Sequence, residues 1–229
     1  MMHSTSNENI TVKSIESFSN QQVQANNSKH YLRSKRILDF VLALLGVIIL
    51  LPLFVLLASI IKIEDRKGPI IFKQIRVGKN GKRFYMYKFR SMVCNAEDLK
   101  LLLLNQNELT GPVFKIKLDP RVTKVGRFIR KTSIDELPQL LNVLKGDMSL
   151  VGPRPPLPEE VLKYTSYEMQ RLSVTPGLTC YWQVSGRSNT SFERWVELDL
   201  KYIKERNFFI DIKLIFKTFF VLFGSKDAY

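Results

Sequence analysis

The sequence predicts a mixed α+β fold attached to a membrane. A long apolar segment lies near the N-terminus, two amphipathic strands flank an Asn-Gly turn, and short helical segments follow. We expect a polar, disordered tail over residues 1–30, a re-entrant membrane helix over residues 31–64 and a cytoplasmic domain over residues 65–229. This domain should contain a β-hairpin and amphipathic helices at the membrane interface.

The composition favours an anionic partner and a reducing compartment. The formal net charge is +14 and the pI is about 9.8, which suits nucleic acid, anionic lipid headgroups or a phosphorylated substrate. Cys94 and Cys180 are too few for a disulfide scaffold and lack zinc-ligand spacing, so we expect free thiols. Residues 1–30 are polar, and we expect no cleavable signal peptide there.

The apolar segment covers residues 40–61 and carries no charge over about 22 residues, which is long enough for a helix to span a ~30 Å hydrocarbon core. Pro52 lies in its middle and favours a kink. Positive residues mark the cytoplasmic side of a membrane, and both flanks are basic. A helix that enters and returns on one face is therefore expected, and a kinked span stays open. The flanking cations are Lys29, Arg33, Lys35, Arg36, Lys62, Arg66, Lys67 and Lys73.

Two strands are predicted next, over residues 70–77 and 84–90, and the Asn-Gly turn in residues 78–81 joins them as a hairpin. Residues 96–106 form a predicted Leu-rich helix. The aromatic-rich segment 208–223 contains too many charges to span a membrane. It suits a helix lying in the membrane interface and equally a helix docked on the core.

Two adjacent carboxylates, Asp135 and Glu136, stand out in this basic chain. Ser133 and Glu136 match a capping box, which predicts a helix that ends at Lys145-Gly146. Acidic residues are favoured at helix N-termini because of the helix dipole. Capping is therefore one interpretation of the pair, and catalysis is another.

Basic residues in and near stiff loops favour catalysis. Residues 151–156 form a proline-rich loop that presents Arg154, and residues 183–188 form a second, glycine-marked basic loop. Guanidinium groups at strand and helix ends can hold phosphate oxygens. Together with two carboxylates they predict a phosphoryl-transfer site, in which one acid attacks phosphorus and the other holds a divalent cation. The other basic candidates are Lys88, Arg90, Arg127, Arg130 and Lys131.

Several motifs occur in a fixed order and cover about residues 32–229. They are KRILD at 35–39, YKFRSM at 87–92, IDELPQL at 134–140, NVLKGDMS at 142–149, VGPRP at 151–155, PGLT at 176–179 and QVSGR at 183–187. By these motifs the chain resembles the bacterial sugar transferase family, the monotopic phosphoglycosyl transferases, also called polyprenyl-phosphate hexose-1-phosphate transferases.

The resemblance implies a two-step reaction through a covalent phosphosugar intermediate. Asp135 matches the family nucleophile, Glu136 matches the acid associated with Mg²⁺, and Pro52 matches the break in the membrane helix. The implied partners are a UDP-sugar donor, polyprenyl (undecaprenyl) phosphate as acceptor and the lipid bilayer; a homo-oligomer stays open. The positions implied to bind substrate or phosphate are Lys88, Arg90, Arg130, Arg154, Gln183 and Arg187.

The implied role is the first membrane step of exopolysaccharide, capsule or related glycoconjugate assembly, at the cytoplasmic face of the bacterial inner membrane. UDP-glucose or UDP-galactose is the expected donor. Leu51 and the Cys180-Tyr-Trp182 run depart from the family pattern, which affects support for the helix break and the substrate preference. The alternative is a basic, membrane-attached binding or scaffold protein without catalysis. No nucleic-acid-binding motif is present, so we expect no nucleic-acid partner.

Overall fold

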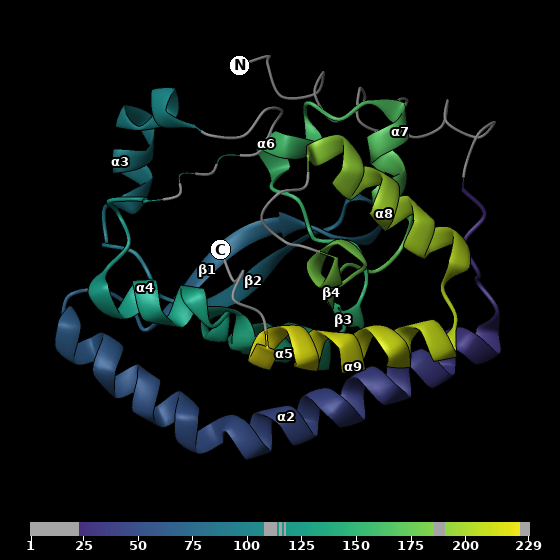
Figure 1. Ribbon diagram of the computed structural model, residues 1–229, viewed down its shortest axis with the longest axis horizontal. Helices are drawn as coiled ribbons and strands as arrows, with labels where there is room; N and C mark the ends of the chain where they lie inside the picture. The colour runs from purple at the N-terminus through teal and green to yellow at the C-terminus, as the bar shows by residue number, and fades with distance from the viewer. Residues whose placement is uncertain (1–22, 108–113, 115, 117, 186–190, 225–229) are drawn as a thin grey trace, which may run out of the picture.

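Helix α2 (Lys29–Glu64) runs along one side of the molecule, and the other elements lie above it in Figure 1. The computed structural model describes residues 23–107, 114, 116, 118–185 and 191–224. Within these ranges, α2 is the one helix that is long and apolar enough to cross a membrane. Helices and short strands are mixed along the chain, which confirms the α+β class.

Figure 1 shows α2 bent near its middle, with both limbs rising toward the rest of the protein. Pro52 lies inside the helix and has no N–H to donate to the preceding turn, which favours a bend. The predicted helix-break-helix therefore takes the form of a bend within one continuous helix. Large apolar side chains remain exposed around it, including Ile49 at 73% and Val55 at 61% exposure.

The predicted hairpin is confirmed. Strands β1 (Ile71–Val77) and β2 (Arg83–Phe89) pair antiparallel, with Ile71 opposite Phe89. The turn between them holds the 3-10 helix η1 (Lys79–Gly81), in which Asn80 has φ 55°. Gly81 has φ 78°. Asn and Gly tolerate this left-handed conformation best, which explains the Asn-Gly pair at this turn.

Short helices connect the hairpin to the second half of the chain. The Leu-rich helix predicted at 96–106 is present as α3 and η2. The capping box predicted at Ser133 is wrong: Ser133 has φ 56°, its side chain makes no capping hydrogen bond, and a 3-10 helix follows it. Pro138, inside this 3-10 helix, cannot donate a backbone hydrogen bond. The elements are α3 (Ala96–Leu102), η2 (Leu104–Gln106), α4 (Lys124–Lys131), η3 (Ile134–Gln139) and α5 (Leu140–Lys145).

Helix α5 ends where the sequence predicts. Gly146 follows Lys145 with φ 87°, a left-handed conformation that glycine adopts without strain. The chain then forms a two-stranded parallel sheet from β3 (Ser149–Val151) and β4 (Gly177–Thr179). A Cβ atom on Gly177 would overlap the backbone of Gly152, so the Pro-Gly motif permits the close approach of these segments.

The second half of the chain packs around Val151, Trp195 and Tyr202. Helix α9 docks on this core through Leu214, which is 1% exposed, while Phe209 and Phe220 on α9 are 81% and 76% exposed. The helix therefore combines a docked face with an exposed aromatic face. The remaining elements are α6 (Pro158–Val161), α7 (Ser166–Met169), η4 (Gln170–Ser173), η5 (Trp182–Val184), α8 (Phe192–Glu205) and α9 (Phe208–Gly224).

The end of the predicted tail also has defined contacts. The Asn26 carbonyl accepts hydrogen bonds from Arg206 Nε at 3.1 Å and Nη2 at 2.9 Å. The backbone N–H of Val23 donates to the side chain of Gln170 at 2.9 Å. Residues 23–28 thus lie against the second half of the chain, and residues 1–22 of the predicted tail lie outside the described residues.

Candidate active site

The two adjacent carboxylates lie at the start of η3, next to strand β2. Ser133 turns the chain sharply between α4 and η3 because its backbone is left-handed. This turn brings η3 against β2, and the two elements are in close contact. Asp135 is buried, at 7% exposure, whereas the Glu136 side chain is 46% exposed.

An ion pair links this turn to the hairpin. Lys88 Nζ on β2 lies 2.6 Å from Glu136 Oε1. Burial raises the pKa of Asp135 from 3.8 to about 6, and the nearby charge of Lys88 opposes this rise. Glu136 raises the pKa further, whereas Arg130 at the end of α4 lowers it. The structure thus places Lys88, Arg130, Asp135 and Glu136 in one electrostatic cluster.

Asn142, near the start of α5, holds α5 against strand β2, which carries Lys88. Its Nδ2 donates to the Tyr85 carbonyl at 2.7 Å, and its Oδ1 accepts from the Tyr87 backbone N–H at 3.0 Å. The side chain is fully buried at 0% exposure. These bonds fix α5 to the backbone of β2 at Tyr85 and Tyr87, just before Lys88. The sequence carried a signal for this role, a single Asn among the leucines of α5, but no role was predicted for it.

Arg90, predicted to bind phosphate, binds the C-terminal end of α2 in this structure. Its Nη2 donates to the carbonyl oxygens of Ile61 at 3.3 Å and Asp65 at 2.7 Å. Its Nη1 lies 3.4 Å from Asp65 Oδ2, and Arg90 is only 7% exposed. It therefore joins the hairpin to α2, and a phosphate contact for it stays a prediction.

The other predicted binding residues lie in the second half of the chain. Gln183 is in η5, and its Nε2 donates to the Leu178 carbonyl at 3.2 Å. Arg154 lies in the loop after β3, with its Cζ 5.6 Å from the centre of the Trp195 ring. Arg187 lies outside the described residues.

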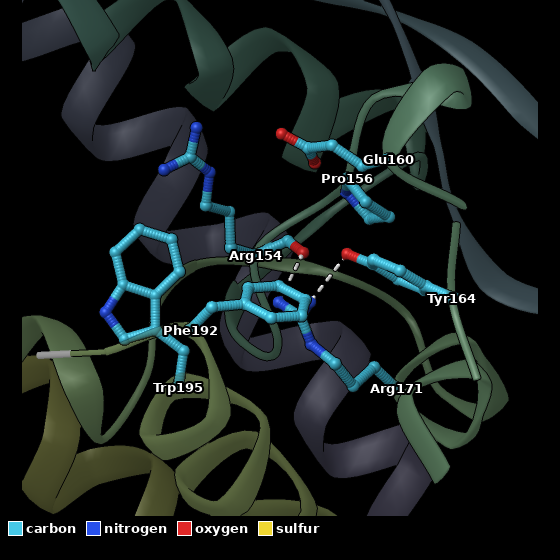
Figure 2. A pocket seen from close by; sticks show the side chains of 7 residues that line it. All are labelled: Arg154, Pro156, Glu160, Tyr164, Arg171, Phe192 and Trp195. Carbon is cyan, nitrogen blue, oxygen red and sulfur yellow. Dashed lines mark hydrogen bonds between the residues drawn. The ribbon is translucent and has the colours of Figure 1, made fainter. Parts of the chain in front are cut away.

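Arg154 borders a small pocket that is partly open to solvent and has room for about one water molecule, about 10 Å³. Figure 2 shows the residues that line it, which come from the loop after β3, from α6 and the turn after it, from η4 and from α8. Arg171, beneath this pocket, forms a buried ion pair with Asp199 at 2.7 Å. The lining residues are Arg154, Pro156, Glu160, Tyr164, Arg171, Phe192 and Trp195.

Asp135 and Glu136 suit a magnesium ion shared with a substrate. Mg²⁺ in phosphate-transferring proteins is usually held by one or two carboxylates, together with phosphate oxygens and water. Within the described chain, no three His, Cys, Asp or Glu side chains gather as a complete protein site. A magnesium ion held by the half-exposed Glu136 together with a phosphorylated substrate therefore stays a prediction.

The sequence analysis also missed the charged groups that bind α2 to the rest of the protein. Lys35 Nζ lies 3.0 Å from Asp211 Oδ2 on α9, and both side chains are buried. Asp39 accepts from Ser149 Oγ at 2.7 Å and from the Leu150 N–H at 3.0 Å. Asp211 interrupts an aromatic-rich segment, and this interruption was the available signal.

Known proteins resemble nearly the whole chain. Galactosyl transferase CpsE from Streptococcus agalactiae is 49% identical over 224 residues, 95% of this chain and 49% of that protein. An undecaprenyl-phosphate galactose phosphotransferase from Salmonella typhimurium is 45% identical over 213 residues, 91% of this chain and 44% of that protein. A UDP-glucose:undecaprenyl-phosphate glucose-1-phosphate transferase from Escherichia coli is 41% identical over 203 residues, 85% of this chain and 41% of that protein.

The chain spans about half the length of these curated relatives or somewhat less. The model of the bacterial sugar transferase family matches residues 30–225, from the first turn of α2 to the end of α9. Both carboxylates, the hairpin and the Arg154 loop lie inside that match. The chain belongs to the bacterial sugar transferase family.

Proposed function

We propose that this protein transfers a hexose 1-phosphate from a UDP-sugar to undecaprenyl phosphate and releases UMP. The observation that carries the proposal is the buried Asp135 beside the Lys88–Glu136 ion pair, 2.6 Å long, in a chain of this family. The named relatives support the substrate class, since they are galactose or glucose phosphotransferases acting on undecaprenyl phosphate.

In the first step, a carboxylate oxygen of Asp135 attacks the phosphorus that carries the sugar. The bond from this phosphorus to the bridging oxygen breaks, and UMP leaves with that oxygen and its electron pair. In the second step, a phosphate oxygen of the lipid attacks the same phosphorus. The bond to Asp135 breaks, the carboxylate is restored, and the product is an undecaprenyl diphosphate sugar.

Cations have to offset the repulsion between a carboxylate and an anionic phosphate. Lys88 and Arg130 are proposed to do this, and their lowering of the pKa of Asp135 supports the proposal. Arg154 and Arg187 are proposed to bind phosphate oxygens more remotely, and Gln183 to contact the substrate. Mg²⁺, bound at Glu136, would supply further neutralisation of the phosphate charge.

The membrane arrangement belongs to the same proposal. We propose that α2 enters and leaves the bilayer on the cytoplasmic face, with the bend near Pro52 as its deepest part. Contacts at both ends support this: Lys35 pairs with Asp211, and Glu64 accepts from the Val125 N–H at 3.0 Å. Both limbs therefore bind the same domain. We propose that the site thereby lies where a lipid phosphate and a cytosolic nucleotide sugar can meet, at the bacterial cytoplasmic membrane.

The donor is proposed to be UDP-galactose or UDP-glucose, and the pathway to be exopolysaccharide, capsule or related glycoconjugate assembly. The test is UMP release by purified protein in lipid nanodiscs with Mg²⁺, undecaprenyl phosphate and each UDP-sugar. UMP that appears only with acceptor and one donor would establish the reaction and the sugar. The Asp135→Asn variant should release none while keeping its fold.

A quenched reaction with radiolabelled sugar and no acceptor tests the covalent step. The label should stay on the denatured wild-type protein and be absent from Asp135→Asn. Turnover without any protein-bound label would instead favour direct attack by the lipid phosphate, with Asp135 as a general base. A folded, membrane-bound protein that releases no UMP from any nucleotide sugar would favour the binding or scaffold role.

A further inference from the structure

The Arg154 loop, residues 153–156 after β3, is rich in hydrogen-bond acceptors and poor in donors. All its residues except Arg154 are prolines, which have no backbone N–H, so their carbonyl oxygens need donors from other segments. Every carbonyl oxygen of the loop has such a donor, and Figure 2 shows the bond from Arg171. The donors are the Gly177 N–H to Pro153 at 2.9 Å, Arg171 Nη2 to Arg154 at 3.5 Å, Arg76 Nη1 to Pro155 at 3.1 Å and the Val77 N–H to Pro156 at 2.9 Å. The loop is therefore held by β4, by η4 and by the end of β1.

Arg76 joins this loop to the hairpin through its side chain. Its guanidinium donates from Nη1 to the Pro155 carbonyl at 3.1 Å, and from Nε and Nη2 to Gln74 Oε1 at 3.1 Å and 2.7 Å. A planar guanidinium that is held on two sides has a fixed orientation. Gln74 thus orients Arg76, and Arg76 holds the loop.

The charge of Arg76 is buried at a cost in free energy. The side chain is on a residue only 4% exposed, and it lies in no ion pair among the described residues. Burial, and then the charge of Arg154, lower the pKa of Arg76 to about 10, while Glu160 and Glu136 oppose this. An apolar side chain would avoid the burial of a charge beside a second cation. Stability alone therefore does not explain an arginine at this position.

The hairpin connects the Arg154 loop with the carboxylates. Arg76 and Lys88 lie on the same face of the hairpin, because the residue opposite Arg76 is Phe84, four positions before Lys88 on β2. These four positions span about 13 Å at ~3.3 Å per residue. Lys88 contacts Glu136 at one end of this face, and Arg76 holds the loop at the other. The strand pair thus sets the distance between the two.

We propose that Arg76 is a positioning residue for the first step of the reaction, in which the donor is cleaved. It acts through the Arg154 loop, which carries a position that the family resemblance assigns to substrate binding. Once UMP has left, the phosphosugar is bound to Asp135 at the far end of the hairpin, so the second step does not depend on Arg76. This inference rests on the proposed function, including its covalent step.

Steady-state kinetics of the full chain in nanodiscs separate the two steps. In a two-step reaction with a covalent intermediate, kcat/KM for the donor reports the first step and kcat/KM for the acceptor reports the second. Arg76→Met should lower kcat/KM for the UDP-sugar about 10- to 100-fold, because a misplaced binding loop costs this much, and should leave the value for undecaprenyl phosphate within about twofold. Arg83→Met, at an exposed arginine of the same hairpin, is the control and should change neither value. An equal loss in both values, or no loss in either, would overturn the proposal.

Two further variants separate geometry from charge. Arg76→Lys keeps the charge but cannot hold Gln74 and Pro155 with one planar group, so it should lose donor efficiency as Arg76→Met does. Gln74→Met keeps the arginine and removes the acceptor that orients it, so it should give a smaller loss of the same kind. This second variant also carries the test if Arg76→Met does not fold. Wild-type kinetics in either variant would contradict the positioning role.

Hydrogen exchange tests the contact without turnover. The Val77 and Gly177 N–H groups both bind the Arg154 loop, so both should exchange faster in Arg76→Met. The Tyr87 N–H, which donates to Asn142, is the control and should not change. Faster exchange in a protein without transferase activity would leave the loop contact in place and remove the reaction. Transferase activity with unchanged exchange and kinetics in Arg76→Met would remove the positioning role and leave the reaction.

Discussion

In the proposed reaction, Asp135 has to be ionised when it attacks phosphorus, although its side chain is buried. Burial raises its pKa to about 6, and without the charges of Lys88 and Arg130 the pKa would be higher. A pKa near 6 still leaves the carboxylate mostly ionised at neutral pH. A carboxylate with a raised pKa is also a better nucleophile than one with a low pKa. Burial thus raises this pKa, and the two nearby cations limit the rise and favour the ionised form.

Transferase activity should fall as the pH decreases through about 6, because the attacking carboxylate of Asp135 becomes protonated there. Lys88→Met should move this acidic limb to higher pH, since it removes a charge that lowers the pKa of Asp135. It should also reduce kcat by on the order of 100-fold. The measurement is the pH profile of UMP release, with Lys82→Met on the exposed hairpin tip as control. An unshifted limb in Lys88→Met would refute this electrostatic role.

Asp135→Asn should stabilise the protein at neutral pH while it abolishes turnover. The folded-state pKa, about 6, lies above the ordinary value of 3.8, so folding binds a proton between these values. The wild type therefore loses stability as the pH rises from about 4 to 6, and the loss stays constant above that. At about 1.4 kcal/mol per pKa unit the gain in Asp135→Asn is on the order of 2–3 kcal/mol at pH 7.5. Thermal unfolding at pH 7.5 and pH 4 measures it; an equal difference at both pH values would contradict the mechanism.

At the scale of elements, the site depends on how α5 and η3 lie against β2. Asn142 sets this register with two hydrogen bonds to backbone groups of β2, at 2.7 Å and 3.0 Å. Met86 on β2 packs with Val143 of α5 in one apolar cluster, so the contact is both polar and apolar. Because Lys88 follows Tyr87 directly, a shift of β2 would move the cation away from Glu136.

Asn142→Ala should destabilise the protein by about 2–4 kcal/mol, because it removes a fully buried side chain and its hydrogen bonds to the Tyr85 carbonyl and the Tyr87 N–H. UMP release should fall more than the loss of folded protein explains, since the position of Lys88 depends on β2. Chemical unfolding and kcat at a temperature where the variant is folded measure the two effects. Leu141→Ala, at a 39% exposed neighbour, is the control. Normal kcat in folded Asn142→Ala would separate Asn142 from the site.

At the scale of the whole molecule, buried polar groups join the membrane helix to the domain. Asp211 on α9 accepts from Tyr31 at 2.9 Å and from Tyr202 at 2.7 Å, and it pairs with Lys35. Arg90 binds the other end of α2. Both ends of the bent helix thus contact the same domain, which is what the proposed re-entrant arrangement requires.

Single cysteines at Lys29 and Arg66, near the two ends of α2, test this topology. The background is Cys94→Ser, because Cys94 is exposed and Cys180 is buried. A membrane-impermeant maleimide should label neither position in intact cells and both in inside-out vesicles. Labelling of one position from outside would mean that α2 crosses the membrane. A cysteine at Lys163, in the domain, gives the control for vesicle orientation.

Local patterns predicted the elements whose cause is local. Asn80-Gly81 supplies the left-handed turn of the hairpin, Gly146 ends α5, and Pro52 marks the bend of α2. The same approach failed at Ser133, where a capping-box pattern adopts a left-handed turn instead. The reason is tertiary: η3 has to lie against β2, and a capped helix starting at Ser133 would not turn the chain there.

The candidate site divides in the same way. The motifs identified Asp135 and Glu136, and their chemistry follows from residue type. The contact of Lys88 with Glu136 joins residues 48 positions apart, and no local pattern specifies it. Arg90 shows the converse: its position predicted a phosphate contact, but its guanidinium binds the end of α2. The sequence gives the charge of each side chain, but tertiary packing determines which partner it contacts.

The sequence by itself determined the family, the apolar helix with its proline, the hairpin and the pair of carboxylates, because each depends on residue type and short-range spacing. Only the tertiary structure decided which cations face Asp135, that Asn142 sets their register, and that Arg154 borders an aromatic pocket. Those features depend on contacts between distant segments. Burial, which raises the pKa of Asp135 to about 6, arises only when these segments have packed together.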